Sequence, residues 1–339
     1  MISDTKKVAH KRNDLSLLLV LAMLLIVNSH LEQYYPFPWL AGGGLIGNAL
    51  FLFVSGYGLM KSWSNKKRSF INYYSRRFRR IYPTLIFSHI LFSILFLSNW
   101  REWAPMDYVR YLILADGYHY IQKVMVFYVV FYVIARQKNN ATYFRYLKNA
   151  LVFLFPLCFY LLAQNGEITN FGSIPPIASW LFYLLVFTLG TIHATGNGNK
   201  SFLSSPFWLL LIVPVITFQY YIVKTQSYLL TPVLFLLLTL TLNSFLVTFQ
   251  QIFNKLPEVF VAITDNLSKY TLEIYIIHFI LIRESALHEI VFPINILALL
   301  GLSLIGALVE KYFLTRLSDL VKPNCKIQTV KSLSSNKKR

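Results

Sequence analysis

The sequence predicts an all-α protein, a polytopic transmembrane helical bundle of about ten spans with both termini on the cytoplasmic side. Three observations carry this prediction. Apolar residues make up 56% of the 339 residues and charged residues only 14%, which leaves too little polar surface for a water-soluble fold. Apolar segments long enough to cross a bilayer recur along the chain, separated by short polar connections. Lysine and arginine gather in alternate connections, as the positive-inside rule requires.

The predicted spans are 15–31, 44–60, 81–98, 121–135, 147–163, 177–193, 206–223, 228–249, 269–285 and 291–313. With the N-terminus inside, the inner segments hold 27 of the 32 Lys and Arg residues. This asymmetry accounts for the net charge of +18 through anionic membrane lipid, so no nucleic acid partner is expected. One membrane domain is expected over 1–322, followed by a basic, disordered cytoplasmic tail over 323–339.

The first span ends in a polar run, Asn-Ser-His-Leu-Glu, at residues 28–32. His30 can take up a proton near neutral pH, and Glu32 could orient it as a general base. Residues i and i+2 point to different sides of a helix, so this pairing requires the helix to end near Leu31, as the prolines that follow favour. Polar residues at a membrane interface would explain the pair equally well.

The second span carries a glycine-rich run over residues 42–58. Gly43 and Gly47 have the four-residue spacing of a tight helix contact, and packing is their favoured role. Asn48 and Ser55 place hydrogen-bonding groups on a buried helix, where they suit the lining of a polar passage. Bonds to a neighbouring helix would satisfy them as well.

The third span begins with Arg76-Arg77-Phe78-Arg79-Arg80-Ile81-Tyr82-Pro83, and Pro83 is expected near the first helical turn. Arg76, Arg79 and Arg80 share one helical face. An anchor at the cytoplasmic membrane surface would explain several of these charges. Arginine at all four sites favours bidentate phosphate contacts over charge alone, so the run also predicts a phosphorylated cytoplasmic ligand.

The ninth span contains Tyr275 and His278, three residues apart and therefore on one helical face. Both are expected to face the protein interior, where a histidine bonded to another helix is a commoner outcome than a catalytic one. The two cysteines, Cys158 and Cys325, lie in opposite environments. Neither a disulfide nor a metal site is expected.

These residues resemble acyltransferase family 3, the integral-membrane O-acyltransferases, over nearly the whole chain. The matching features are a histidine that closes the first helix (His30), the Phe-x-Phe-x-Ser-Gly run from Phe51 to Gly56, the Arg-Arg-x-x-Arg-Ile-x-Pro start of the third span, and a C-terminal Tyr-x-x-His. In one departure, many members carry Arg or Lys on the first helix well before its histidine, where this sequence has Leu19 and Val20.

The resemblance implies that His30 is the catalytic residue and Glu32 its acidic partner. It also implies that Arg76, Arg77 and Arg80 hold the phosphates of coenzyme A. The implied reaction moves an acyl group, acetyl being the most frequent in the family, from cytoplasmic acyl-CoA to a hydroxyl of a carbohydrate or lipid-linked glycan. Acyl-CoA is then a co-substrate, and no metal takes part.

The predicted topology places the arginines inside and His30 toward the outside, so a long donor would bridge them. Its pantetheine arm would pass Ser55 and Asn48. Tyr275, His278 or Asn48 would then hold the developing oxyanion near the thioester.

The implied location is a cell membrane, with the bacterial inner membrane expected, and the implied partners are membrane lipid and the glycan acceptor. A transporter or flippase for a lipid-linked glycan is the alternative, because it would share the spans, the polar interior and the cytoplasmic arginines. The internal symmetry common in such proteins is not seen in the sequence. A sensor without chemistry is a third alternative, disfavoured by His30 and the arginine set.

Overall fold

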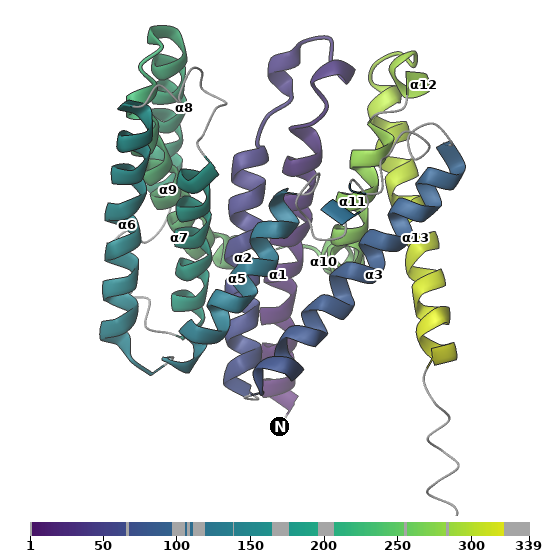
Figure 1. Cartoon of the computed structure of the whole chain (residues 1–339), viewed down its shortest axis with the longest axis horizontal. Coiled ribbons are helices and arrows are strands. Elements are labelled where there is room, and N and C mark those ends of the chain that lie inside the picture. Colours follow the sequence, from purple (N-terminus) through teal and green to yellow (C-terminus); the bar gives the residue numbers. More distant parts are fainter. Residues whose placement is uncertain are drawn as a thin grey trace, which may run out of the picture.

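The computed structural model is a bundle of mostly upright helices, and α3 crosses it obliquely (Figure 1). The structure describes residues 2–65, 68–96, 106, 109–110, 119–137, 139–164, 176–195, 207–253, 256–282 and 285–321. Within these residues every regular element is helical, which confirms the all-α class. The predicted tail over 323–339 lies outside the described residues.

The longer helices are α1 (Ile2–Asn28), α2 (Gly44–Asn65), α3 (Phe70–Phe96), α5 (His119–Arg136), α6 (Ala141–Gln164), α7 (Pro176–Thr195), α8 (Phe207–Thr225), α9 (Thr231–Phe253) and α13 (Ile294–Val321). The shorter ones are η1 (Glu32–Tyr34), η2 (Pro38–Leu40), η3 (Tyr228–Leu230), α10 (Glu258–Leu267), η4 (Ser268–Tyr270), α11 (Thr271–Leu281) and α12 (Ser285–His288). Each of the ten predicted spans overlaps one of these helices.

Four described helices are long and apolar enough to cross a membrane, namely Gly44–Asn65, Thr142–Leu162, Ile177–Thr195 and Ile294–Leu317. Leu15–Asn28 and Thr231–Thr241 are shorter apolar helical segments. The chain is therefore a multi-pass membrane protein by the length and composition of its helices. The total of ten spans and the side on which each terminus lies stay predictions.

The ninth predicted span, 269–285, is not one continuous helix. η4 precedes α11, and α12 follows from Ser285. The 11 residues of α11 reach about 16 Å, roughly half of a hydrocarbon core. Most of its residues are buried, because α11 packs among α1, α3 and α13. Its apolar composition therefore reflects burial in protein, which a sequence pattern does not distinguish from burial in lipid.

The third predicted span begins earlier than expected, because α3 starts at Phe70 and already contains the arginines. Pro83 consequently lies inside the helix and not in its first turn, which corrects the sequence expectation. The early start is stabilised by Tyr73, which is buried and stacks on Phe131 of α5 at a ring-centroid distance of 5.7 Å. Aromatic packing on this side of the helix extends α3 beyond the apolar run.

Helix α2 lies between α1 and α7, and small residues allow both close contacts. A Cβ atom at Gly47 would lie 2.7 Å from the carbonyl oxygen of Ala22 on α1. A Cβ at Gly56 would clash with the carbonyl oxygen of Phe187 on α7, and one at Gly190 would clash with that of Phe53. The helix contact predicted for Gly43 and Gly47 holds for Gly47, whereas Gly43 precedes α2 at a φ of +93°. The Phe-x-Phe-x-Ser-Gly run forms the contact with α7.

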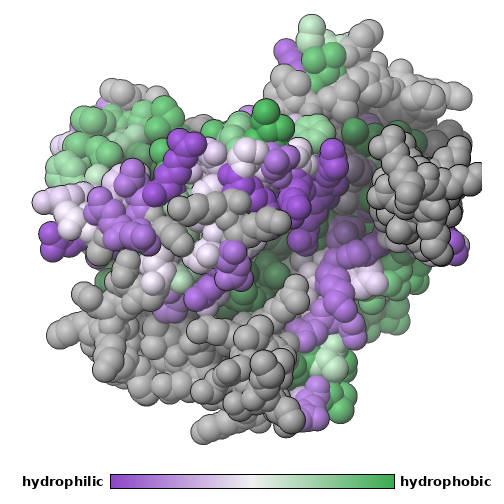
Figure 2. Space-filling view, turned by 90° about the horizontal axis from the view of Figure 1, so that it is seen from below, coloured by the Kyte–Doolittle hydropathy of each residue, from purple (hydrophilic) through white to green (hydrophobic). Residues whose placement is uncertain are grey.

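Hydrophilic side chains gather on the end of the bundle at which the N-terminus lies (Figure 2). The first turns of α3 and the last turns of α2 also lie at this end (Figure 1). This is the face that the charge distribution predicts to be cytoplasmic.

Candidate functional site

A cavity of about 360 Å³ lies at the meeting point of α1, α2, α3, α5 and α11. Much of its wall is apolar, and its polar side chains come from four of these helices: Ser55, Ser62, Arg77, Arg80, Tyr120, Tyr128, Thr271 and Tyr275. The cavity therefore combines cations with hydroxyl groups inside an apolar wall, the composition that suits a small-molecule ligand with a charged end.

Two of the three predicted phosphate-binding arginines line this cavity. Arg77 is half-buried, and its guanidinium lies 5.8 Å from the ring centres of Tyr73 and Tyr128. Arg80, one turn further along α3, is exposed and lines the same cavity. Arg76 is exposed and is not among the lining residues. The structure thus brings Arg77 and Arg80 together, at the i and i+3 positions of one helical face.

A chain of ring contacts connects the cavity to the predicted catalytic histidine. Tyr120 and Tyr275 both line the cavity, and their ring centres lie 5.7 Å apart. Tyr275 lies 5.6 Å from His278, which in turn lies 5.6 Å from His30. Phe279 packs against both histidines, 4.5 Å from His30. His30 itself does not line the cavity, so side chains of α11 separate the two.

The two histidines differ in their surroundings. His278 is completely buried, and its Nδ1 lies 3.3 Å from the carbonyl oxygen of Ile274. Because a carbonyl only accepts, Nδ1 carries the proton and Nε2 is the basic nitrogen. Nε2 is buried without a hydrogen-bond partner among the described residues. His30 is half-buried and lies in the turn that follows α1.

The turn that holds His30 is fixed by the side chain of Asn28. Its amide donates to the carbonyl oxygens of Leu40 at 2.9 Å and Gly42 at 3.0 Å, while its Oδ1 accepts from the Tyr35 hydroxyl. Helix α1 ends at Asn28, slightly earlier than the end near Leu31 that the sequence favours. His30 is therefore presented by a tight turn and not by a helical face.

Glu32, the predicted acidic partner, is exposed and begins η1. In the described part of the chain it makes no hydrogen bond or ion pair with His30. Burial lowers the pKa of the His30 imidazole, and the charge of Glu32 partly opposes this shift. Its influence on His30 is thus electrostatic across a turn.

The two candidates on α2 lie two turns apart and meet different neighbours. Ser55 lines the cavity, as expected for a passage residue. Asn48 is not among the lining residues, and its Nδ2 donates to the Tyr183 hydroxyl on α7 at 3.4 Å. Asn48 therefore takes part in helix packing, the other role that the sequence allowed. Its Oδ1 is buried and has no partner among the described residues.

Leu19 lies in the cavity wall, so the departure from the family pattern has a direct structural consequence. Where many family members carry a cation on the first helix, this cavity has an apolar side chain. Among the described residues, the cations that line the cavity come from α3.

Sequence reasoning missed the tyrosines of α5. Tyr120 and Tyr128 line the cavity, and the Tyr120 hydroxyl is buried without a partner among the described residues. With 22 tyrosines in the chain, no sequence signal separated these two from membrane-interface residues. A second missed group was detectable, because Glu310 and Lys311 are charged residues inside a predicted span.

Comparison with known proteins identifies the family of the chain. A family model described as an acyltransferase domain matches residues 12–309, a stretch that includes all the cavity residues named above. No curated protein and no solved structure matches the chain. Since the family model covers most of the sequence, the chain belongs to acyltransferase family 3.

Proposed function

We propose that this membrane acyltransferase moves an acyl group, acetyl in the first instance, from cytoplasmic acyl-CoA to a hydroxyl of a carbohydrate or lipid-linked glycan. The observation that carries the proposal is that Arg77 and Arg80 share a cavity with Tyr275, whose ring contacts continue through His278 to His30. Arginine guanidinium groups at one end suit phosphates, and imidazole groups at the other suit a hydroxyl nucleophile.

The donor end of the path has the chemistry that acyl-CoA requires. Arg77 and Arg80 would bind its phosphates, while the apolar wall with Ser55 would accommodate the pantetheine arm. The free hydroxyl of Tyr120 is a hydrogen-bond donor inside this space. We assign it, with Tyr275, to the thioester carbonyl and to the oxyanion that develops from it.

At the other end, His30 would act as the general base. It takes the proton of the acceptor hydroxyl while the hydroxyl oxygen attacks the thioester carbon. The carbon–sulfur bond then breaks, and the proton passes from His30 to the leaving thiolate, giving the ester and free coenzyme A. In the tautomer set by Ile274, Nε2 of His278 can accept a hydrogen bond from protonated His30 but cannot donate to an oxyanion.

We place the protein in a bacterial inner membrane, with the acceptor approaching from the outer side. The test is transfer of label from acetyl-labelled acetyl-CoA by purified protein in lipid nanodiscs, supplied with a glycolipid extract of the source membranes. Alkali-labile label in the glycolipid supports an O-acyltransferase. Movement of glycolipid across vesicles without label transfer would instead support the flippase alternative.

A further inference from the structure

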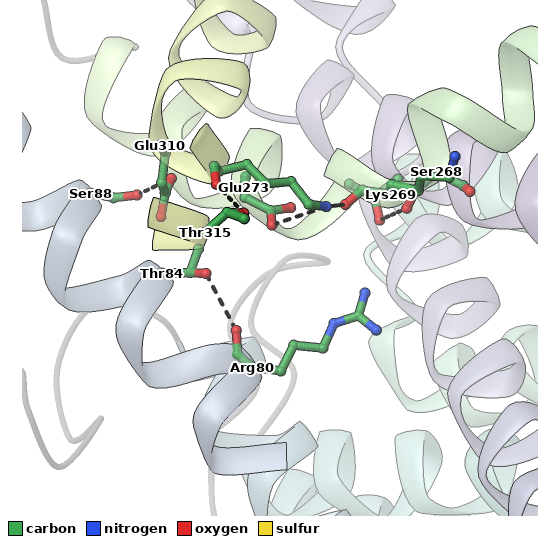
Figure 3. Close-up of polar contacts among 10 residues, drawn as sticks. Arg80, Thr84, Ser88, Ser268, Lys269, Glu273, Glu310 and Thr315 are labelled. Atoms are coloured by element: carbon green, nitrogen blue, oxygen red, sulfur yellow. Dashed lines mark hydrogen bonds and ion pairs between the residues drawn. The ribbon is translucent and has the colours of Figure 1, made fainter. Parts of the chain in front are cut away.

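Helix α13 carries a buried charged residue, Glu310, inside an apolar segment (Figure 3). The side chain is 0% exposed, and its Oε2 accepts a 2.7 Å hydrogen bond from Ser88 Oγ on α3. The other oxygen, Oε1, has no hydrogen-bond partner in the described part of the chain. A buried carboxyl group with a single partner is costly in a membrane helix, so its presence points to a role beyond packing.

The next residue, Lys311, contacts a different neighbour. Its ammonium lies 3.7 Å from Glu273 Oε1 on α11 and 4.5 Å from the ring centre of Tyr270, and it donates to the carbonyl oxygen of Lys269. Lys269 and Tyr270 belong to η4, which leads directly into α11. Lys311 thus fixes the start of α11 through three contacts.

The two helices held by these neighbours also form the cavity. On α3, Ser88 follows Arg80 by two turns on the same face, and the Thr84 hydroxyl between them donates to the Arg80 carbonyl at 3.3 Å (Figure 3). On α11, Glu273 precedes Tyr275 by two residues. Arg80 on α3 and Tyr275 on α11 both line the cavity, so the spacing of these two helices affects its width.

We propose that Glu310 and Lys311 are positioning residues, which hold α3 and α11 at the separation that lets Arg80 and Tyr275 bind one acyl-CoA molecule. Neither residue lines the cavity, so both act through the helices that they join. The proposal rests on the proposed function, because its ligand is the coenzyme A donor. It adds a part of the protein that determines donor affinity from outside the binding site.

The test is a double-mutant cycle on the Ser88–Glu310 hydrogen bond, measured on purified full-length protein in nanodiscs. Coenzyme A binding is followed by calorimetry, and KM and kcat are measured with acetyl-CoA. Ser88→Ala and Glu310→Leu are each expected to raise Kd and KM about fivefold, the equilibrium effect of one ordinary hydrogen bond, with kcat unchanged. The double variant should be no weaker than either single one.

Two variants separate positioning from general stability. Glu310→Gln keeps an oxygen that accepts from Ser88, and it should bind coenzyme A like the wild type. Arg316→Gln removes a positive charge from the same helix, where the guanidinium packs 5.4 Å from the Tyr312 ring, and it should leave Kd unchanged. Ser88→Ala is the mildest change. It tests the hydrogen bond by itself if Glu310→Leu folds poorly.

The ion pair between Lys311 and Glu273 gives a second test, independent of the Ser88–Glu310 hydrogen bond. In Lys311→Gln/Glu273→Gln the ion pair is removed without leaving a buried charge unpaired, and Kd should again rise about fivefold. Lys311→Arg, with Glu273 unchanged, keeps the ion pair and should bind coenzyme A like the wild type. If Ser88→Ala and the Gln/Gln variant lowered only the Tm and left Kd and KM unchanged, the positioning role would be wrong. If the wild type bound no coenzyme A, the donor assignment itself would fail instead.

Discussion

At the residue scale, the proposed general base, His30, follows a helix and does not lie within one. Asn28 closes the turn through Leu40 and Gly42, and this turn presents His30 to His278 on α11. Phe279 packs against both rings, so apolar contact holds the two imidazoles in place.

Replacing His30 by alanine should abolish most transfer, because the general base is removed while the cavity is untouched. We expect the rate to fall by about 10²- to 10⁴-fold at unchanged coenzyme A affinity. The measurement is label transfer from acetyl-CoA, with size-exclusion chromatography as the check on folding. A folded His30→Ala protein with normal transfer would exclude this mechanism.

The arginines allow a comparison between neighbours. Arg77 and Arg80 line the cavity, whereas Arg76 is exposed outside it. Arg80→Gln should therefore raise KM for acetyl-CoA by about tenfold or more, the effect of losing a charge-assisted hydrogen bond. The matched variant Arg76→Gln should change KM by less than about twofold. Equal effects would mean that the phosphates are bound by the charge of the whole run.

At the element scale, α2 is the central support of the site. One face meets α1 through Gly47 and another meets α7 through Gly56, while Ser55 between them lines the cavity. The same short run of sequence therefore provides packing and lining. This follows because consecutive helical residues point in directions about 100° apart.

Gly56→Ala should destabilise the protein, since the added methyl group meets a backbone oxygen of α7 that cannot move aside by a rotamer change. We expect a loss of about 1–3 kcal/mol, visible as a lower Tm in detergent. Gly58→Ala is the control, because a Cβ there meets nothing within 4 Å. Equal Tm values for the two variants would contradict the close contact of α2 and α7.

At the scale of the whole molecule, the proposed function has donor and acceptor approach from opposite faces. The hydrophilic end of the bundle (Figure 2) is also the end at which α3 begins (Figure 1), and the arginines lie in the first half of that helix. The turn after α1 lies at the other end (Figure 1). This separation follows from the length of α1 and from the oblique course of α3.

This topology predicts opposite labelling of two exposed positions. In a background without native cysteines, Glu32→Cys should react with a membrane-impermeant maleimide in intact cells. Arg79→Cys should react only after permeabilisation, because its segment is predicted to be cytoplasmic. Labelling of both positions in intact cells would refute the predicted topology.

The sequence by itself determined the helical class, the presence of membrane segments and the family. These follow from apolar composition and from local motifs such as the Phe51-to-Gly56 run, since both are properties of neighbours in the chain. Gly47 was also predicted correctly as a packing residue, because a glycine-rich helical run is a local pattern that favours close helix contact.

Only the tertiary structure decided which candidates share a site. It placed Arg77 and Arg80 on the cavity but not Arg76, turned Asn48 toward α7, and brought His278 to His30. Helical periodicity gives the angle of a residue on its own helix but not the neighbour that this angle meets. Burial against protein and burial in lipid select the same apolar residues, which is why the short, enclosed α11 was predicted as a full span.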